Sequence, residues 1–229
     1  MQSINPFTNK LVNTYQDHTA SEVRQIIREV AEAWQSWRKT SPEERAGYLL
    51  NLERQLLNDQ EPLAAGMVGE MGKVKREALG EIKKCAWVCR YYAENGAGFL
   101  QNEPVIADAG ESYVSFQPLG TILAIMPWNF PFWQVFRFLA PALMAGNTAV
   151  LKHAGNVAGC SLAIEQTVKK AGLPENVFRS PIPACHSAES RKAGMGGNSL
   201  FSGSGNLSIL KPWWSNKPTG KTTALSCRS

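Results

Sequence analysis

Apolar residues recur at helical spacing through the first hundred residues of the chain. The first series follows the segment Thr19-Ala20-Ser21 and Glu22, which offers a helix N-cap with an acid in the first turn. Its apolar members are Val23, Ile26, Ile27, Val30, Ala33 and Trp34. This spacing predicts an amphipathic helix that begins within or just after residues 19–21.

Further helices are predicted before residue 100. Ser41 stands before Pro42, and proline is favoured at the first position of a helix. The apolar stripe of this second helix consists of Leu49, Leu52, Leu56 and Leu57. We expect a third helix over roughly 61–71 and a fourth over roughly 75–92. The N-terminal third is therefore predicted to be helical, with helices that pack rather than catalyse.

The period of the pattern changes after residue 100. Val105–Ala107 and Tyr113–Phe116 are short apolar runs that flank a turn-forming segment, D-A-G-E. Such runs predict the two strands of a β-hairpin. Its edges would be unpaired, so the hairpin would favour contact with another chain.

The most informative stretch is 117–160. It contains an apolar strand pattern, a loop bounded by prolines, an apolar helix, a Gly-Asn turn and a second strand pattern. This order is typical of a βαβ unit. We expect parallel strands at about 121–126 and 148–152, and a helix from about Phe132 to Ala145 packed on the sheet.

The loop of this unit carries a polar residue among apolar ones. Asn129 lies between Trp128 and Phe130, and Pro127 and Pro131 restrict the backbone on either side. Open α/β sheets bind ligands at the carboxyl ends of their strands. Asn129 is therefore a candidate site residue, although an asparagine here could instead cap the following helix.

Composition limits the classes of function. A chain of 229 residues with 44% hydrophobic content can bury one substantial core. Its first residues do not resemble a signal peptide and its most apolar run is interrupted by prolines, so we expect a cytoplasmic protein without a membrane partner. Five scattered cysteines do not suggest a disulfide framework. The net charge of +5 is spread over helices without a nucleic-acid module, so nucleic-acid binding is not favoured.

Two motifs carry a resemblance to a known family. The first is P-L-G-x-I-x-x-I-x-P-W-N-F-P, and the second is A-L-x-A-G-N-T-x-x-L-K. At this spacing they resemble the N-terminal cofactor domain of aldehyde dehydrogenases. The form L-K-H-A resembles the succinate-semialdehyde dehydrogenase branch. The resemblance begins near Asn5, includes E-M-G-K at 70–73, and fades after Phe178.

The resemblance implies a fold and a domain organisation. It implies an α/β fold, a Rossmann-type three-layer sandwich similar to that of aldehyde dehydrogenases. Residues 1–178 would form the N-terminal NAD(P)-binding domain, with a hairpin at about 101–117 from the family's oligomerisation arm. Residues 179–229, rich in Ser, Gly and Lys, would form an irregular tail.

The resemblance also implies roles for individual residues. Asn129 matches the amide that stabilises the negative oxygen formed during aldehyde oxidation. Lys152 matches a lysine that hydrogen-bonds the adenosine ribose. The residues expected to contact the nicotinamide half of the cofactor are Ile125, Met126, Pro127 and Trp128.

Gly155 departs from the family pattern. Many members place an acid at this position to bind both ribose hydroxyls, as the Rossmann acid does for NAD. Without that carboxylate, and with Lys152 and His153 nearby, NADP becomes at least as plausible a cofactor as NAD. His153 could equally be a packing histidine.

The C-terminal part matches the family less well. Phe201–Ser204 stands where the family has its phosphate-binding F-T-G-S turn, so Gly203 and Ser204 are candidate phosphate contacts, but Pro212 would break the helix that should follow. Ser226 stands where the family has its general-base glutamate, and no cysteine has the context of the family's nucleophile. No metal site is expected.

The resemblance thus predicts an oxidoreductase that oxidises an aldehyde, expected to be succinate semialdehyde, with NAD(P). The chain as given would be inactive because it lacks the base and the nucleophile. As in the family, the intact protein would be a homo-oligomer. The alternative is a non-catalytic module that binds a nucleotide or another subunit.

Overall fold

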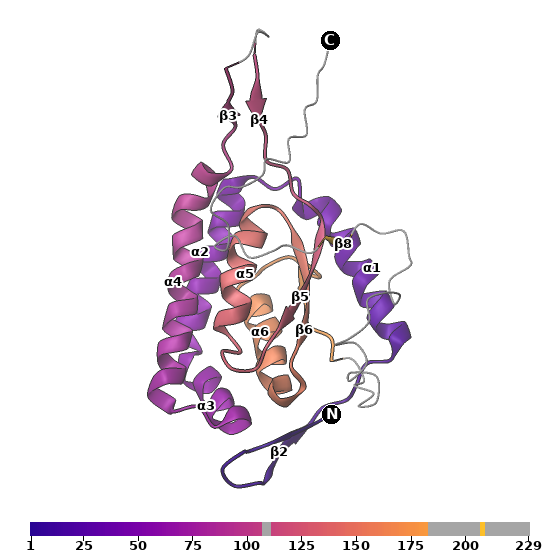
Figure 1. Cartoon of the computed structure of the whole chain (residues 1–229), viewed down its shortest axis with the longest axis vertical. Helices are drawn as coiled ribbons and strands as arrows, with labels where there is room; N and C mark the ends of the chain where they lie inside the picture. The colour runs from indigo at the N-terminus through magenta and orange to yellow at the C-terminus, as the bar shows by residue number, and fades with distance from the viewer. Residues whose placement is uncertain (107–110, 183–206, 209–229) are drawn as a thin grey trace.

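The computed structural model describes residues 1–106 and 111–182, together with the backbone of Leu207 and Ser208. The chain begins with an antiparallel hairpin of β1 (Gln2–Ile4) and β2 (Leu11–Thr14). The hairpin lies at the bottom of Figure 1. The hydrophobic pattern did not predict it, because the side chains of β2 are all exposed and show no alternation.

Helices α1 (Ala20–Trp37) and α2 (Pro42–Asn58) both begin with a capping box. Thr19 Oγ1 accepts from Glu22 N at 3.2 Å, and Glu22 Oε2 accepts from Thr19 N at 2.6 Å. Ser41 and Glu44 exchange the same pair of bonds at 3.2 and 2.7 Å. The helix starts predicted near residues 19–21 and at Ser41 are therefore confirmed.

One member of the apolar stripe predicted for α2 is not part of the core. Leu49, Leu52 and Leu56 are buried, whereas Leu57 is 37% exposed. Leu57 directly follows Leu56, and one residue along a helix turns the side chain by about 100° away from the buried face.

Helix α3 (Gln60–Met71) agrees with its prediction, but α4 (Lys75–Phe99) continues beyond the end expected near Tyr92. The extension packs closely on the rest of the molecule. A Cβ atom at Gly96 would overlap the Met144 side chain, so a glycine is needed for this approach. Tertiary contact therefore extends the helix through A-E-N-G-A-G, a sequence with weak helical propensity.

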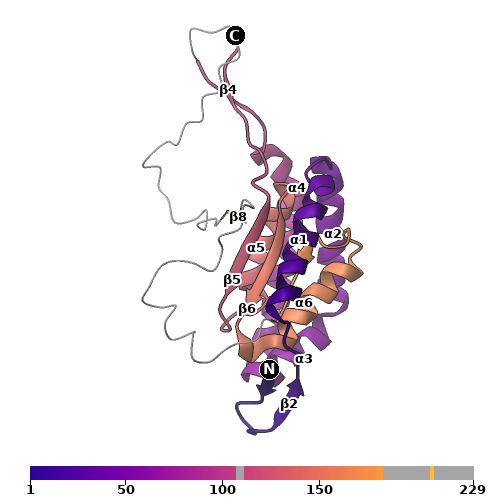
Figure 2. The same cartoon turned by 90° about the vertical axis from the view of Figure 1, so that its right-hand side faces the viewer.

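The second hairpin exists, but its strands are shorter than predicted. They are β3 (Glu103–Pro104) and β4 (Tyr113–Val114), with Pro104 opposite Tyr113. The first strand was expected at 105–107, and that placement is wrong because this register leaves Ile106 fully exposed outside the strand. The hairpin projects from the body of the molecule in both Figure 1 and Figure 2.

The central sheet contains the predicted βαβ unit. Strands β5 (Thr121–Met126) and β6 (Thr148–His153) are parallel, and α5 (Trp133–Met144) connects them. Strand β7 (Phe178–Arg179) pairs with β6, and β8 (Leu207–Ser208) pairs with the start of β5, both in parallel. The strand order is β7-β6-β5-β8.

Helices cover both faces of this sheet. On one face, Ile26 and Val30 of α1 pack against Val150 of β6. On the other face, α5 and α6 (Ala158–Lys170) pack against alternate residues of the strands such as Ala124 and Leu151, with α2 and α4 behind them. Figure 1 shows α1 alone on its side of the sheet. The three-layer α/β sandwich predicted from the sequence is confirmed.

The A-G-N-T turn fixes the two central strands relative to each other. Asn147 Oδ1 accepts from the backbone N–H groups of Leu119 and Gly120 at 2.7 and 3.0 Å. Gly146 has φ of 79°, and Arg45 Nη1 donates to Met144 O at 2.8 Å. This part of the second motif therefore has a structural role, because it aligns the amino ends of β5 and β6.

The boundary expected after Phe178 falls inside β7. The following residues contact the core: Ser180 and Ile182 are buried, and His18 N donates to Ile182 O at 2.6 Å. No helix in the described ranges is both long and apolar enough to cross a membrane.

Candidate functional site

Two groups of candidate residues meet at one edge of the sheet. Because β5 and β6 are parallel, their carboxyl ends coincide, and Ile125 and Met126 stand opposite Lys152 and His153. The predicted residues brought together here are Ile125, Met126, Pro127, Trp128, Asn129, Lys152, His153 and Gly155. Gly203 and Ser204 lie outside the described residues.

The apolar members of the site are largely open to solvent. Ile125 is 67% exposed and Trp128 is 52% exposed, while Met126 is partly buried against the core. Exposed apolar side chains at a strand end are not explained by core packing. They offer a surface on which a flat ring could lie.

Asn129 is exposed and makes no hydrogen bond to another residue that the structure describes. It does not cap α5. The first two N–H groups at this helix start, those of Phe132 and Trp133, both donate to Glu81 Oε1 at 2.9 Å. The amide of Asn129 therefore remains available for an external acceptor.

Glu81 belongs to a buried support of this loop that the sequence analysis missed. Its other oxygen, Oε2, pairs with Lys73 Nζ, and the two side chains are 2% and 7% exposed. Lys73 Nζ also lies 4.0 Å from the centroid of the Phe130 ring, which is a cation–π contact. The loop residues on both sides of Pro131 are thus held from α4 and from the segment before it. The E-M-G-K motif, which ends at Lys73, was the available signal.

A second carboxylate caps the helix after β6. Glu70 accepts from Gly159 N at 2.9 Å and from Cys160 N at 2.8 Å. Tyr15 Oη donates to Glu70 at 3.1 Å, and burial together with this carboxylate raises the pKa of Tyr15 to about 12. A side chain at Gly159 would overlap Tyr15 Oη.

These two caps restrict where a phosphate can bind. In a common dinucleotide site, the diphosphate accepts from N–H groups at the start of the helix after the first strand. Here protein carboxylates already occupy the N-terminal N–H groups of α5 and α6. An anion would meet a carboxylate at either helix start, so a diphosphate must be held elsewhere.

Lys152 and His153 point to opposite faces of the sheet, because side chains alternate along a strand. Lys152 is partly exposed and shares the α1 face with Ile125. His153 is only 7% exposed, and burial lowers its pKa below the ordinary value. A neutral histidine on the other face cannot supply positive charge beside Lys152. The geometry agrees with the packing interpretation of His153.

Gly155 opens the short 3-10 turn η1 (Gly155–Val157) beyond β6. A Cβ atom there would lie 3.0 Å from Met1 Sδ and 3.1 Å from Met1 Cε. These atoms form the end of a flexible side chain. A larger residue at position 155 is therefore sterically tolerable if Met1 shifts.

The cysteines of the described residues are unsuited to nucleophilic attack. Cys85, Cys89 and Cys160 are buried and unpaired. Burial raises the pKa of each thiol, and the carboxylate of Glu70 raises that of Cys160 further. A thiol rather than a thiolate is inert. The interpretation of these three as structural thiols is supported.

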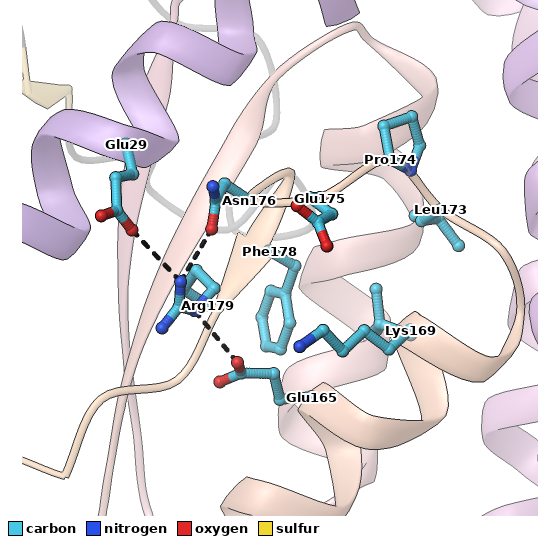
Figure 3. A pocket seen from close by; sticks show the side chains of 10 residues that line it. Glu29, Glu165, Lys169, Leu173, Pro174, Glu175, Asn176, Phe178 and Arg179 are labelled. Atoms are coloured by element: carbon cyan, nitrogen blue, oxygen red, sulfur yellow. Dashed lines mark hydrogen bonds and ion pairs between the residues drawn. The ribbon is translucent and has the colours of Figure 1, made fainter.

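One cavity among the described residues lies away from this site. It has a volume of about 260 Å³ and is drawn in Figure 3. Arg179 in its wall pairs with Glu29 of α1 at 3.3 Å and with Glu165 of α6 at 3.0 Å. Phe178 pairs with Ala149 near the amino end of β6, whereas the candidate site is at the carboxyl end. The cavity is therefore separate from the cofactor candidates.

These features indicate a dinucleotide-binding α/β protein. They are the parallel sheet, the loop with the exposed amide of Asn129, and Lys152 at the end of the next strand. The chain belongs to the aldehyde dehydrogenase family, whose profile matches residues 1–185.

Its curated relatives include succinate-semialdehyde dehydrogenases. An enzyme of Synechocystis sp. named "probable succinate-semialdehyde dehydrogenase, NADP(+)" is 46% identical over 178 residues, which are 78% of this chain and 39% of that protein. The Escherichia coli enzyme Sad, named for succinate semialdehyde and NAD(P)+, is 39% identical over 176 residues, 77% of this chain and 38% of its own length. The chain thus spans about two fifths of the length of these relatives.

A solved structure gives the same result for the fold. The succinic semialdehyde dehydrogenase of Streptococcus pyogenes in complex with NADP+ is 32% identical, with a TM-score of 0.78. The similarity covers 83% of this chain and 42% of that chain.

Proposed function

We propose that this chain is the N-terminal cofactor-binding part of an NAD(P)-dependent aldehyde dehydrogenase, and that the whole protein oxidises succinate semialdehyde. The main observation is the exposed amide of Asn129, which follows the carboxyl end of β5. Glu81 binds the backbone just after this loop, and Lys152 lies at the adjacent end of β6. The names of the relatives support the substrate and the cofactor.

Each residue has a distinct task in this proposal. When bound, NADP or NAD supplies the hydride acceptor. The Asn129 amide donates a hydrogen bond to the substrate oxygen as it becomes negative after attack on the aldehyde carbon. Ile125 and Trp128 provide apolar contact to the nicotinamide half of the cofactor, and Lys152 donates to its ribose.

The residues fit part of a dinucleotide site rather than all of it. Exposed Ile125 and Trp128 fit a ring, and Lys152 fits a ribose hydroxyl or phosphate. The starts of α5 and α6 do not fit the diphosphate, because Glu81 and Glu70 occupy them. Gly203 and Ser204 remain the proposed phosphate contacts.

Calorimetric titration of the 229-residue chain with NADP and with NAD tests the proposal. We expect saturable binding that Lys152→Met weakens at least about tenfold, since a charge-assisted hydrogen bond contributes about 1.5–3 kcal/mol. Lys10→Met removes an exposed charge from the N-terminal hairpin and should leave the affinity unchanged. Absence of binding, or equal losses in both variants, would contradict the proposal.

The same chain is not expected to reduce NADP in the presence of succinate semialdehyde. Its sequence lacks the family's G-Q-x-C segment and has Ser226 at the base position. A serine cannot take the proton that the attacking water must lose. NADPH formation above background, abolished by Asn129→Ala, would show that this expectation is wrong.

A second candidate function, contact with another subunit, rests on the β3–β4 hairpin. Ile106 is fully exposed, and Tyr113 and Val114 are 55% and 42% exposed. An apolar hairpin that projects from the body favours pairing with a second copy of the chain. Sedimentation should detect self-association that Ile106→Lys abolishes and that the control Phe7→Lys, in the other exposed hairpin, does not. A monomeric wild type would rule this candidate out.

A further inference from the structure

The imidazole of His153 joins two backbone segments of the site. Its Nε2 lies 2.9 Å from the carbonyl oxygen of Pro131, near the end of the loop that carries Asn129. Its Nδ1 accepts from the backbone N–H of Ala154 at 2.8 Å. One ring thus spans from the end of β6 to the end of the Asn129 loop.

The two partners determine the tautomer of the ring. A carbonyl oxygen can only accept and a backbone N–H can only donate. Nε2 must therefore carry the proton, and Nδ1 must present its lone pair. The doubly protonated ring would place an Nδ1–H against the N–H of Ala154, so the contact requires a neutral histidine.

The surroundings of the ring hold it in this arrangement. His153 is 7% exposed, and Pro131 is buried as well. The charged groups near the ring are Glu70 from α3, Glu81 from α4 and Lys152 from its own strand. Glu81 and Glu70 are already engaged with the starts of α5 and α6, so neither forms a hydrogen bond with the imidazole.

We propose that His153 is a positioning residue, which holds the loop of Asn129 at a fixed separation from Lys152 through the bond from Nε2–H to Pro131 O. This inference rests on the proposed function, because the separation matters only if both side chains contact one bound cofactor–substrate pair. In this proposal His153 does not bind the cofactor phosphate; it positions the loop that carries Asn129.

Besides the contact of Phe130 with Lys73, the side chains of the loop do little to anchor it, so the loop needs such a tether. Trp128 and Phe130 are 52% and 45% exposed, and Asn129 is exposed. Its far end is held by Glu81 at Phe132 and Trp133. The bond to Pro131 is the described contact that ties the loop to the neighbouring strand, whose last residues are Lys152 and His153.

The first test is spectroscopic and needs no ligand. The chain contains 3 histidines, so nitrogen NMR of the rings can be assigned by comparison with a His153 variant. We expect the neutral tautomer with the proton on Nε2 at neutral pH. A proton on Nδ1, or a doubly protonated ring at that pH, would overturn the proposal.

The second test uses two matched variants. His153→Gln places an amide N–H near the position of Nε2 and retains a donor for Pro131 O. His153→Asn places an amide oxygen near the position of Nδ1 and retains an acceptor for Ala154 N–H, but it loses the bond to the loop. Both variants have a smaller side chain than histidine. If His153 had only a structural role, loop mobility and NADP affinity would change in both variants in proportion to the change in unfolding midpoint.

We expect His153→Asn to raise the backbone mobility of Trp128, Asn129 and Phe130 in nitrogen relaxation and to weaken NADP binding about fivefold, the factor that corresponds to one net hydrogen bond. His153→Gln should keep both properties close to wild type. Equal behaviour of the two variants, in either direction, would refute the tether. If the wild-type chain binds no cofactor, the proposed function fails, while the tautomer and the loop mobility still decide the inference about His153.

Discussion

Under the proposed function, position 155 affects the charge near the cofactor ribose, and this chain has Gly155 there. An acid there would repel a 2′-phosphate, and at a few ångströms such repulsion amounts to about 1 kcal/mol or more even with partial screening. We predict that Gly155→Glu moves the preference from NADP toward NAD by about tenfold. Gly155→Gln is the control, because it displaces the Met1 side chain equally and adds no charge. A preference that changes equally in both variants would assign the effect to Met1.

His153 also makes the stability of the protein depend on pH. Burial lowers its pKa in the folded state below the ordinary 6.5, so the unfolded chain binds more protons as the pH falls through this range. The stabilisation is complete above about pH 6.5 and is lost progressively as the pH falls toward the lowered pKa. We predict that His153→Gln flattens this part of the profile of unfolding free energy, measured with urea between about pH 5 and pH 7.5. An unchanged slope would contradict it.

The sequence indicated which residues are candidates for the site more readily than it indicated what those residues contact. Asn129 was predicted as a site residue because its neighbours in the chain form a motif; its side chain is exposed, and its role stays a prediction. The environment of His153 was not predictable, since Pro131 reaches it only after the chain has formed a strand and a helix. Alternation along β6 then separates His153 from Lys152, which a linear comparison of adjacent residues does not reveal.

At the scale of elements, the start of α5 depends on a buried ion pair between α4 and the preceding segment. Lys73→Met would leave the carboxylate of Glu81 buried without its cation, which typically costs about 3–5 kcal/mol. Lys73→Met combined with Glu81→Gln removes both charges and keeps an acceptor oxygen for Phe132 N and Trp133 N. We predict that this double variant loses less free energy of unfolding in urea than the two single variants lose when their losses are added.

The exposed pair of Lys75 and Glu61 provides the comparison, since these side chains are 64% and 63% exposed. Lys75→Met should leave the unfolding midpoint unchanged. Additive effects of Lys73→Met and Glu81→Gln would show that the buried pair is not coupled.

The elements that the sequence predicted well are those with local signals. The capping boxes of α1 and α2 and the βαβ pattern lie within short windows, and the structure contains them. The added length of α4 depends on packing against Met144, and the caps of α5 and α6 come from residues far earlier in the chain. No local pattern encodes such contacts, so single-sequence analysis cannot predict them.

At the scale of the whole molecule, the described core ends at Ile182, where it pairs with His18 near the start of α1. This closure joins the two ends of the described core, and the residues between them contain the three-layer core. We predict that a chain truncated after Ile182 unfolds in one cooperative transition, with a midpoint within about 5 °C of the full chain, because residues 1–182 contain all the buried side chains that the structure describes. Circular dichroism on heating measures this. A broad transition without a midpoint would show that the core needs residues beyond Ile182.

The ion pairs of Arg179 affect the edge of the sheet at which a further strand can pair. Arg179 bridges Glu29 and Glu165 from helices on opposite faces, so the free edge of β7 is short and charged, which discourages a further strand. At the other edge, Thr121 and Ile122 of β5 alone pair with the described residues of β8. The ribosome synthesises the N-terminal residues first, so β5, β6 and β7 can pair with one another before later residues emerge. A strand formed by later residues can then pair beside β5, as the described residues of β8 do, so the order of translation and the order of strands across the sheet are consistent.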